Sequence, residues 1–417
     1  MWQNYGMKVA LAKFNTITAT CPACGLLCDD IQLENNNNKI KVLTRSCEKS
    51  VRFFEQSLSD ASPQINGKPA SLHLAVAYAA KLIKASQQPL FAGLSTDVQG
   101  FRTIYNLAQT NNGSLQHLSA QSMARNIKVL QNTGWQTTTL TEVKNRADVI
   151  VCIGSDIVSQ HPRFFERFVD VDGLFVQAKH RQVIVIGEAN NNGIIKSNVL
   201  AGAQILACRM DDLPSITIAL RALVAGKCLK ASEVAGVKVS DLQAVADRLK
   251  QAKYAVLAWV AKDLDYPHAE LTIQNITETV AILNQTTRAA GLALGGSDGD
   301  TSANNANTWL SSFVLNNGAL NDVPIEHDLM VWVNSFSSEK ILSKMPPTSD
   351  KPLIVFGNAN CQFETLPEVF IPIATPGLDC SGTLFRVDSS VILPLKKIRD
   401  NALPTLHEVV SEVEKLL

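Results

Sequence analysis

The sequence predicts an α/β protein in which a small, β-rich cysteine module precedes two related, doubly wound lobes. Three observations indicate this: four cysteines gathered within the first 47 residues, apolar runs that alternate with amphipathic segments, and two pairs of similar strand segments far apart in the chain. We expect the module over residues 1–60, the first lobe over 61–240 and the second over 241–417, and we leave open whether the lobes are interleaved.

The composition limits the class of protein. The 417 residues carry 38 Lys and Arg against 38 Asp and Glu, and 46% of them are hydrophobic, enough for the cores of two or three domains. Zero net charge argues against a nucleic-acid partner, because such proteins carry a basic surplus. No run reaches the ~20 apolar residues of a membrane span, and no signal-peptide pattern is present. We therefore expect a cytoplasmic protein without a membrane partner.

The N-terminal module is expected to contain a hairpin. The strand-like runs 30–33 (DIQL) and 39–43 (KIKVL) flank the asparagines at 35–38. Asparagine tolerates the left-handed backbone of a tight turn, so the two runs are predicted to pair. Residues 50–58 are predicted to form a short helix, and 61–70, with a proline and a glycine, a linker.

The rest of the chain alternates between helical and strand patterns. Apolar runs of four to seven residues between amphipathic helices are typical of a parallel sheet covered on both faces. The expected strands are 89–94, 148–153, 183–186, 254–260, 328–333, 352–356 and 369–374, and the expected helices are 72–85, 99–111, 241–251, 268–286 and 405–417.

Two pairs of segments suggest an internal repeat. Residues 147–156 (ADVIVCIGSD) resemble 327–336 (HDLMVWVNSF), and 181–190 (RQVIVIGEAN) resemble 351–360 (KPLIVFGNAN). The separations within the pairs are similar, so we infer two related lobes packed about a pseudo-twofold axis. A cleft between such lobes is the expected place for a large ligand.

The cysteine cluster is the strongest motif. Cys21, Cys24 and Cys28 lie in CPACGLLCDD, and Cys47 follows after the predicted hairpin. Three thiolates at spacings of three and four residues, with Gly25 relieving the turn, can converge on one centre that the fourth completes. Such a set suits a four-iron four-sulfur cluster or a zinc ion, and the alternative is a group of buried structural thiols.

A glycine-rich turn is a weaker candidate. Gly295, Gly296 and Gly299 in GGSDG could present successive backbone amides to a phosphate. The alternative is an interlobe loop, and we favour it because no confident strand precedes the turn and no clear helix follows it. Acidic residues on loops after strands, among them Asp298 and Asp300, form no recognisable acid/base pair.

A second candidate group follows a predicted strand. Gly154 ends the apolar run at 148–153, and His161 and Arg163 come shortly after it. Ligands of α/β folds bind at such carboxyl ends, so His161 could be a polar contact and Arg163 a phosphate clamp. The alternatives are a histidine bonded to the backbone and an arginine at a lobe interface.

Five segments spread over nearly the whole chain point to a known family: 20–31, 89–95, 147–163, 295–309 and 369–388. In this order they resemble the B subunit of formylmethanofuran dehydrogenase, a family of the molybdopterin oxidoreductase superfamily. The resemblance implies a module of the iron–sulfur type and two lobes of the molybdopterin-oxidoreductase type. In that family the lobes hold a bis-pterin tungsten or molybdenum cofactor, which lies near the glycine turn.

The sequence departs from this family at the metal ligand. A family member has a ligating cysteine after the first strand–helix pair of the lobe, and the corresponding residues 118–126 (LSAQSMARN) contain none. Ser122 stands near the ligand position. A soft, redox-active metal prefers a thiolate, so we expect the bis-pterin metal to be lost, with a serine-ligated metal as the alternative.

This departure resembles the branch of the family found in aerobic methylotrophs. There a similar subunit belongs to a formyltransferase/hydrolase complex, which transfers a formyl group from tetrahydromethanopterin to methanofuran or an analogue and hydrolyses it to formate. The resemblance implies a catalytically inactive, structural chain. Its implied partners are an amidohydrolase-like subunit, a formyltransferase subunit and a further scaffold subunit, with the methanofuran-type carrier as an additional candidate. The alternative is an active molybdenum or tungsten formylmethanofuran or formate dehydrogenase with a four-iron cluster.

Overall fold

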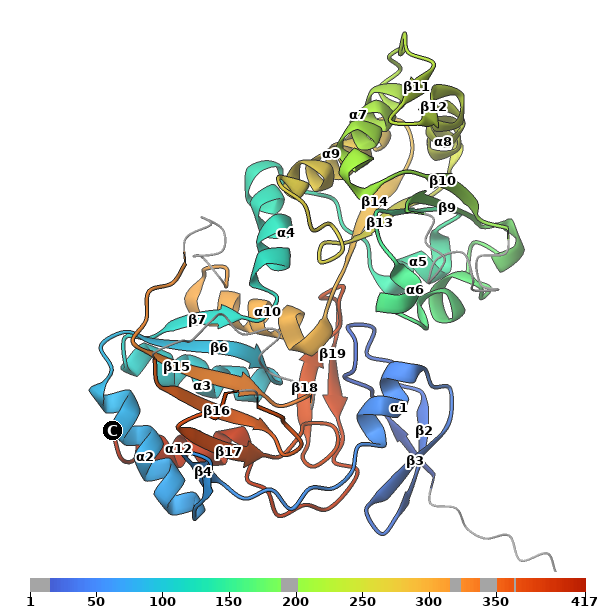
Figure 1. The fold of residues 1–417 in the computed structure, drawn as a ribbon. Helices are drawn as coiled ribbons and strands as arrows, with labels where there is room; N and C mark the ends of the chain where they lie inside the picture. Colours follow the sequence, from blue (N-terminus) through green and yellow to red (C-terminus); the bar gives the residue numbers. More distant parts are fainter. Residues whose placement is uncertain (1–15, 189–201, 316–323, 338–350, 364) are drawn as a thin grey trace, which may run out of the picture.

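The computed structural model describes residues 16–188, 202–315, 324–337, 351–363 and 365–417. Residues 1–15 of the expected module and the last two residues of the repeat segment 181–190 lie outside this part of the chain. A small module and two α/β lobes make up the described structure (Figure 1). None of the described helices is both long and apolar enough to cross a membrane.

The module contains the predicted hairpin. Asn37 and Asn38 form its two-residue turn with φ of 51° and 67°, the left-handed backbone that asparagine tolerates. Buried Ile31, Leu33 and Phe54 form part of the core beneath the sheet. The elements are β1 (Thr16–Ala19), β2 (Ile31–Asn36), β3 (Lys39–Thr44) and α1 (Glu48–Phe54).

The lower lobe in Figure 1 is built on a seven-stranded sheet in the order β5-β4-β17-β16-β15-β6-β7. The residues expected to be a linker, 61–70, contribute the short strands β4 (Gln64–Ile65) and β5 (Lys68–Pro69), which extend the sheet edge beside β17. The other elements are β6 (Pro89–Ser95), β7 (Ser114–His117), β15 (Leu329–Asn334), β16 (Leu353–Asn358), β17 (Val369–Ile373), α2 (Leu72–Ala85), α3 (Val98–Thr110), α10 (Asp300–Ser311) and α12 (Leu406–Glu414).

The upper lobe contains a five-stranded parallel sheet in the order β10-β9-β8-β13-β14. Strands β8 and β13 are buried throughout, as their apolar runs predict, whereas the edge strand β10 is partly exposed. The strands are β8 (Val149–Ile153), β9 (Gln182–Gly187), β10 (Gln204–Ala207), β13 (Ala255–Val260) and β14 (Ala289–Leu294). The helices are α4 (Ala120–Thr133), α5 (Leu140–Arg146), α6 (Ile157–Gln160), α7 (Leu213–Val224), α8 (Val239–Gln251) and α9 (Ala269–Leu283). The small hairpin of β11 (Glu233–Val234) and β12 (Val237–Lys238) belongs to this lobe, whereas the hairpin of β18 (Gly382–Phe385) and β19 (Ile392–Leu395) contacts α3 and α10 of the lower lobe (Figure 1).

The two sheets share one strand arrangement. The order β10-β9-β8-β13-β14 corresponds, strand for strand, to β17-β16-β15-β6-β7 in the other lobe. The similar segments fall on equivalent strands, because β8 corresponds to β15 and β9 to β16. When the upper strands are numbered along the chain from β8 as 1 to β14 as 5, their order in the sheet is 3-2-1-4-5, which is a doubly wound order. The predicted fold class, two related doubly wound α/β lobes, is confirmed.

The lobes are interleaved, and a boundary at residues 240 and 241 does not separate the sheets. Strand β6 pairs with β15, more than 200 residues later, while the chain between them builds the whole upper sheet. Strands β8 and β13, on opposite sides of the expected boundary, pair with each other. Parallel pairing through long crossovers leaves no local signal, because an apolar run does not specify which strand it will meet.

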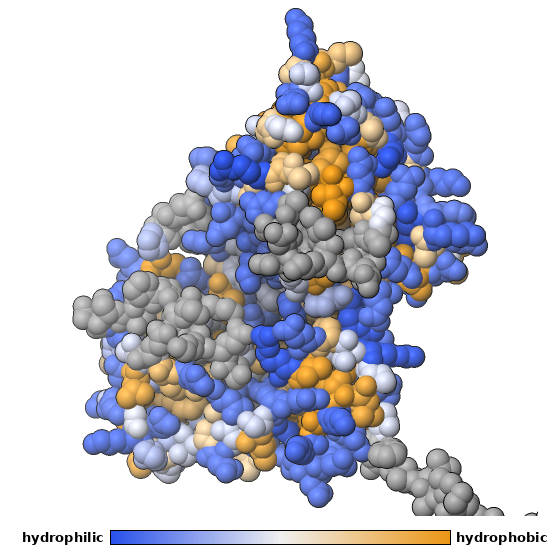
Figure 2. Space-filling model, turned by 45° about the vertical axis from the view of Figure 1, so that its right-hand side comes forward, coloured by the Kyte–Doolittle hydropathy of each residue, from blue (hydrophilic) through white to orange (hydrophobic). Residues whose placement is uncertain are grey.

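Figure 2 shows that hydrophilic residues cover most of one face of the molecule, with hydrophobic residues gathered in several places on both the upper and the lower part. The carboxyl ends of β8 and β13 in one lobe and of β6 and β15 in the other are the switch points of the two sheets, where a doubly wound fold binds its ligands. We therefore expect the functional site in the region between the lobes, near these strand ends.

Candidate functional site

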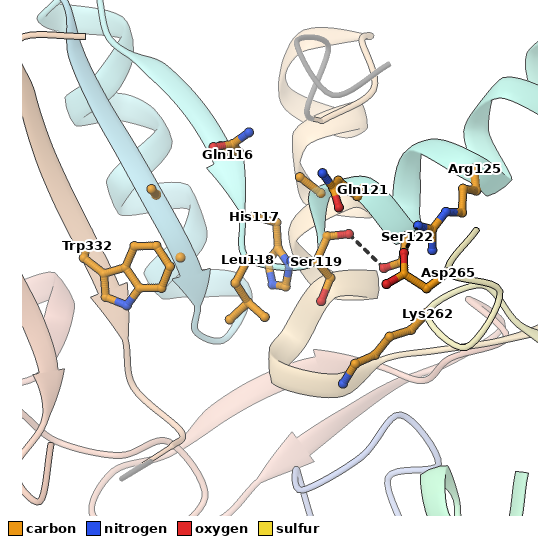
Figure 3. Close-up of a pocket in the computed structure, with 13 residues that line it drawn as sticks. Gln116, His117, Leu118, Ser119, Gln121, Ser122, Arg125, Lys262, Asp265 and Trp332 are labelled. Carbon is orange, nitrogen blue, oxygen red and sulfur yellow. Dashed lines mark hydrogen bonds and ion pairs between the residues drawn. The ribbon is translucent and has the colours of Figure 1, made fainter. Parts of the chain in front are cut away.

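A cavity of about 420 Å³ lies between the two lobes (Figure 3). Its walls come from the ends of β6 and β7, the first turns of α4, the loop after β13 and the centre of β15. The lining residues are Ala92, Gly93, Gln116, His117, Leu118, Ser119, Ala120, Gln121, Ser122, Arg125, Lys262, Asp265 and Trp332.

Ser122, the residue near the family's metal-ligand position, lies on the wall of this cavity. Its Oγ donates a hydrogen bond to the carbonyl oxygen of Ser119, at 2.9 Å (Figure 3). Ser122 also lines a second, smaller cavity together with Cys24 and His161. The predicted position is therefore at the interlobe site and next to the cysteine module, and no cysteine of the described residues lines the larger cavity.

The four cysteines of the module lie close enough to influence one another. Cys21, Cys24 and Cys28 are buried, and Cys47 is half-buried at the N-cap of α1. Burial raises the pKa of the Cys21 thiol, and the Cys24, Cys28 and Cys47 thiolates raise it further. Burial and neighbouring thiolates also raise the pKa of Cys24, to about 12. Thiols in such surroundings ionise readily only when a metal centre takes up their negative charge.

Cationic side chains surround these sulfurs. Burial raises the pKa of Cys28, and the guanidinium groups of Arg167 and Arg163 oppose that rise. Lys49 opposes the corresponding rise at Cys24. Among the described residues, no three Cys, His, Asp or Glu side chains lie close enough to hold a single metal ion. Whether the quartet holds a four-iron four-sulfur cluster or a zinc ion stays a prediction.

His161 is buried beside Ser122 and Cys24, in the wall of the smaller cavity. Neither ring nitrogen has a hydrogen-bond partner among the described residues, so the alternative of a backbone-bonded histidine is wrong. Burial, reinforced by Lys49, lowers the pKa of His161 to about 3, so the ring is neutral at physiological pH. A polar contact from His161 to a ligand stays a prediction.

Arg163 lies at the interface between the upper lobe and the cysteine module. Its Nη1 and Nη2 donate to the two Asp30 carboxylate oxygens at 2.7 and 2.9 Å. Its Nε and Nη2 also donate to Glu166, at 3.1 and 2.7 Å. Arg163 is thus an interface arginine, the alternative that we considered for it. The Asp30 and Glu166 carboxylates occupy the guanidinium nitrogens with which a phosphate clamp would bind. Gly154 has a φ of 60°, and a Cβ at this position would lie 2.4 Å from the Leu213 Cδ1, so the backbone and its packing require a glycine here, while its contact with a ligand stays a prediction.

The glycine turn at Gly295 connects a strand to a helix, contrary to our expectation, because β14 precedes it and α10 follows. The sequence pattern did not reveal either element, since β14 is short and alanine-rich and α10 is rich in asparagine. A Cβ on Gly25 would lie 2.4 Å from the Gly295 oxygen and 2.8 Å from the Gly296 Cα. Gly25 and the turn are therefore needed where the module packs on the lobes, and Gly299 similarly approaches the Thr96 oxygen.

The turn encloses the carboxyl group of Asp300. This carboxyl group accepts hydrogen bonds from the backbone N–H of Thr301, at 2.5 Å, and from that of Gly296. Burial raises the pKa of Asp300 to about 7, with a further contribution from Asp298. The Asp300 side chain thus engages one amide of the turn, that of Gly296, and a phosphate contact at the turn stays a prediction.

Several side chains of the larger cavity were not predicted from the sequence. Lys262 follows β13, and His117 ends β7, so both lie at carboxyl ends of strands. The rule that ligands bind at these ends could have identified them once the strands were known. Arg125 of α4 pairs with Asp265 across the cavity wall, a contact for which the sequence carries no signal.

No family model matches the chain. Two curated relatives are B subunits of tungsten-containing formylmethanofuran dehydrogenase 2. The one from Methanococcus maripaludis is 26% identical over 91% of this chain and 92% of its own. The one from Methanocaldococcus jannaschii is 24% identical over 91% and 93%. The B subunit of the formyltransferase/hydrolase complex Fhc from Methylorubrum extorquens is 38% identical over 22% of this chain and 25% of its own.

Solved structures show the same fold. A chain of the Methylorubrum extorquens formyltransferase/hydrolase complex FhcABCD, solved with methylofuran, aligns at a TM-score of 0.68 and 24% identity over 85% of this chain and 98% of that one. Acetylene hydratase from Pelobacter acetylenicus aligns at 0.65 and 12% identity over 95% and 68%. The predicted resemblance is thus confirmed: the chain is similar, over nine tenths of its length, to the B subunit of formylmethanofuran dehydrogenase.

Proposed function

We propose that the chain is a non-redox, structural subunit of a formyltransferase/hydrolase complex in one-carbon metabolism. The observation that carries this proposal is Ser122, which stands on the interlobe cavity near the position of the family's thiolate ligand. A neutral hydroxyl bonded to the Ser119 carbonyl is a poor ligand for a soft metal. The similarity to the B subunits of the dehydrogenase and of Fhc supports the wider assignment to a one-carbon complex.

Two further features support the loss of the pterin cofactor. The Asp300 carboxyl group engages one amide of the glycine turn, and Arg163 is engaged by Asp30 and Glu166. Both groups are thereby less available to a dinucleotide phosphate. Formyl transfer and hydrolysis then belong to a formyltransferase subunit and an amidohydrolase-like subunit, and this chain contributes architecture. A further scaffold subunit and a methanofuran-type carrier complete the proposed set of partners.

For the cysteine module we propose a structural four-iron four-sulfur cluster held by Cys21, Cys24, Cys28 and Cys47. When bound, the cluster would fix the module, which is too small to hold a large core of its own. The cations Lys49, Arg163 and Arg167 would stabilise its negative charge. A zinc ion at the same four cysteines is the alternative, and metal analysis of the purified chain distinguishes the two.

The second candidate function is an active dehydrogenase, and the cysteine quartet and His161 favour it. A buried, neutral imidazole beside Ser122 could contact a small substrate, and the quartet could pass electrons. Ser122→Ala in the purified complex separates the two functions. Our proposal predicts that the rate of formate release from the formyl carrier changes by less than about twofold, since a chain without catalytic groups supplies no transition-state interaction. Dye reduction driven by formate in the wild type and abolished in the variant would contradict it.

A further inference from the structure

A second large cavity, of about 630 Å³, lies at the end of the upper sheet opposite the interlobe site. It lies at the amino ends of three neighbouring strands, because Asp148, Tyr254 and Arg288 directly precede β8, β13 and β14. The lining residues are Arg146, Asp148, Gly173, Leu174, Phe175, Val176, Gln177, His180, Lys253, Tyr254 and Arg288. None of them takes part in the site described above.

The cavity is basic. Lys253, Arg288 and Arg146, the last paired with Glu142 of its own helix at 2.9 Å, line it, against one lining carboxylate, Asp148. The Asp148 oxygens accept hydrogen bonds from the backbone N–H groups of Lys253 and Tyr254, both at 2.9 Å. Among the ion pairs of the described residues, none involves Lys253 or Arg288. Two exposed cations thus flank a concave surface without a carboxylate of the described chain bound to either.

An apolar wall stands beside these cations. Leu174 and Phe175 are 78% and 65% exposed, among the most exposed large hydrophobic residues of the described chain. The guanidinium of Arg146 lies 4.5 Å from the centre of the Phe175 ring. Aromatic and arginine side chains next to each other are the composition of protein-binding hot spots.

The loop that carries this wall is fixed before any partner binds. The Phe175 N–H donates to the Asn145 carbonyl oxygen at 3.0 Å, and the Gly173 N–H to that of Val176 at 2.8 Å. The Arg181 guanidinium donates to the carbonyl oxygens of Val143, Ala147 and Val171, which joins the loop to the end of α5. A loop held in this way presents Leu174 and Phe175 at little entropic cost on binding.

We propose that this basic and apolar surface binds an acidic peptide segment of a partner protein, with one apolar side chain seated against Phe175. Acidic groups complement Lys253 and Arg288, and an apolar group covers the exposed ring. A protein segment fits better than a small anion, because the two apolar side chains stand outward and a small ligand would leave them in water. The proposal does not depend on the proposed function.

The test uses the full-length chain and a short fluorescein-labelled peptide of aspartates around one phenylalanine, followed by fluorescence anisotropy. The same peptide with lysines in place of the aspartates is the control probe. We expect the acidic peptide alone to bind, with an affinity that falls as salt is raised, because exposed charges are screened. No binding of the acidic peptide at low salt, or equal binding of both peptides, would overturn the proposal.

Variants locate the binding. Lys253→Glu with Arg288→Glu should weaken binding on the order of tenfold, since each reversal replaces an attraction by a repulsion. The matched reversal of two exposed lysines elsewhere on the lobe, Lys227→Glu with Lys230→Glu, should change it by less than about twofold at the same net charge. Equal loss in both double variants would place the binding elsewhere and overturn the proposal. Circular dichroism and thermal melting verify that each variant is folded.

The apolar part of the surface is tested separately. Phe175→Ala should weaken binding several-fold and leave its salt dependence unchanged, because it removes apolar area and no charge. Leu271→Ala, at a 51% exposed site on α9, is the matched control and should bind as the wild type does. If Phe175→Ala binds like the wild type, no apolar contact forms at this wall and the proposal is wrong.

Discussion

Asp300 should make the stability of this protein fall as the pH rises. Its carboxyl is buried in the glycine turn, which raises the pKa from the ordinary 3.8 to about 7 in the folded chain. The folded protein therefore holds a proton that the unfolded chain has released, and the free energy of unfolding decreases between these two values. Each pKa difference of one is worth ~1.4 kcal/mol, so the full penalty above pH 7 is about 4 kcal/mol.

The variant Asp300→Asn removes this titration and keeps a side-chain oxygen that accepts the turn amides. Between pH 5 and pH 8 the wild type should lose about 2.5 kcal/mol of stability relative to the variant, the part of the penalty that falls in this window. Urea unfolding followed by tryptophan fluorescence at both pH values measures it. Asp60→Asn, at an exposed carboxylate, is the matched control and should follow the wild type. Equal pH dependence in the wild type and Asp300→Asn would refute the burial of this carboxylate in the turn.

Three further predictions concern the module. Cys24→Ser should lower the iron content of the purified chain and make the module more sensitive to protease, measured by iron analysis and limited proteolysis; unchanged iron would exclude the cluster. Gly25→Ala should destabilise the chain by ~1–3 kcal/mol in urea, since its Cβ would lie 2.4 Å from the Gly295 oxygen; a smaller effect would show that the contact is not tight. Arg163→Met should cost ~2–3 kcal/mol, because Asp30 of the module loses its bidentate partner and keeps only Arg167; stability like that of the wild type would contradict this.

The local elements were predictable because their signals are local. The hairpin at Asn37 and Asn38 needs only its own turn residues, and α2 coincides with the predicted 72–85. The apolar runs gave most central strands to within one or two residues. The alanine-rich β14 and the asparagine-rich α10 were missed, because neither has the composition that usually marks its type.

The site depended on contacts that no local pattern specifies. The cysteine spacing predicted the quartet, and the resemblance predicted the importance of Ser122, which does line the interlobe cavity. The ion pair between Arg163 and Asp30 joins residues 133 positions apart, and the pairing of β6 with β15 spans a whole inserted lobe. Tertiary packing determines such partners, so a sequence motif can identify Arg163 as a candidate residue but cannot identify the residue that it binds.

The metal content of the complex purified from cells tests the central proposal most directly. Elemental analysis of the intact complex should find tungsten and molybdenum far below one atom per chain, since Ser122 replaces the thiolate ligand and Asp300 engages the turn. Iron should approach about four atoms per chain, the content of a cluster held by four thiolates. Tungsten or molybdenum at one atom per chain would contradict the proposal and establish the dehydrogenase alternative.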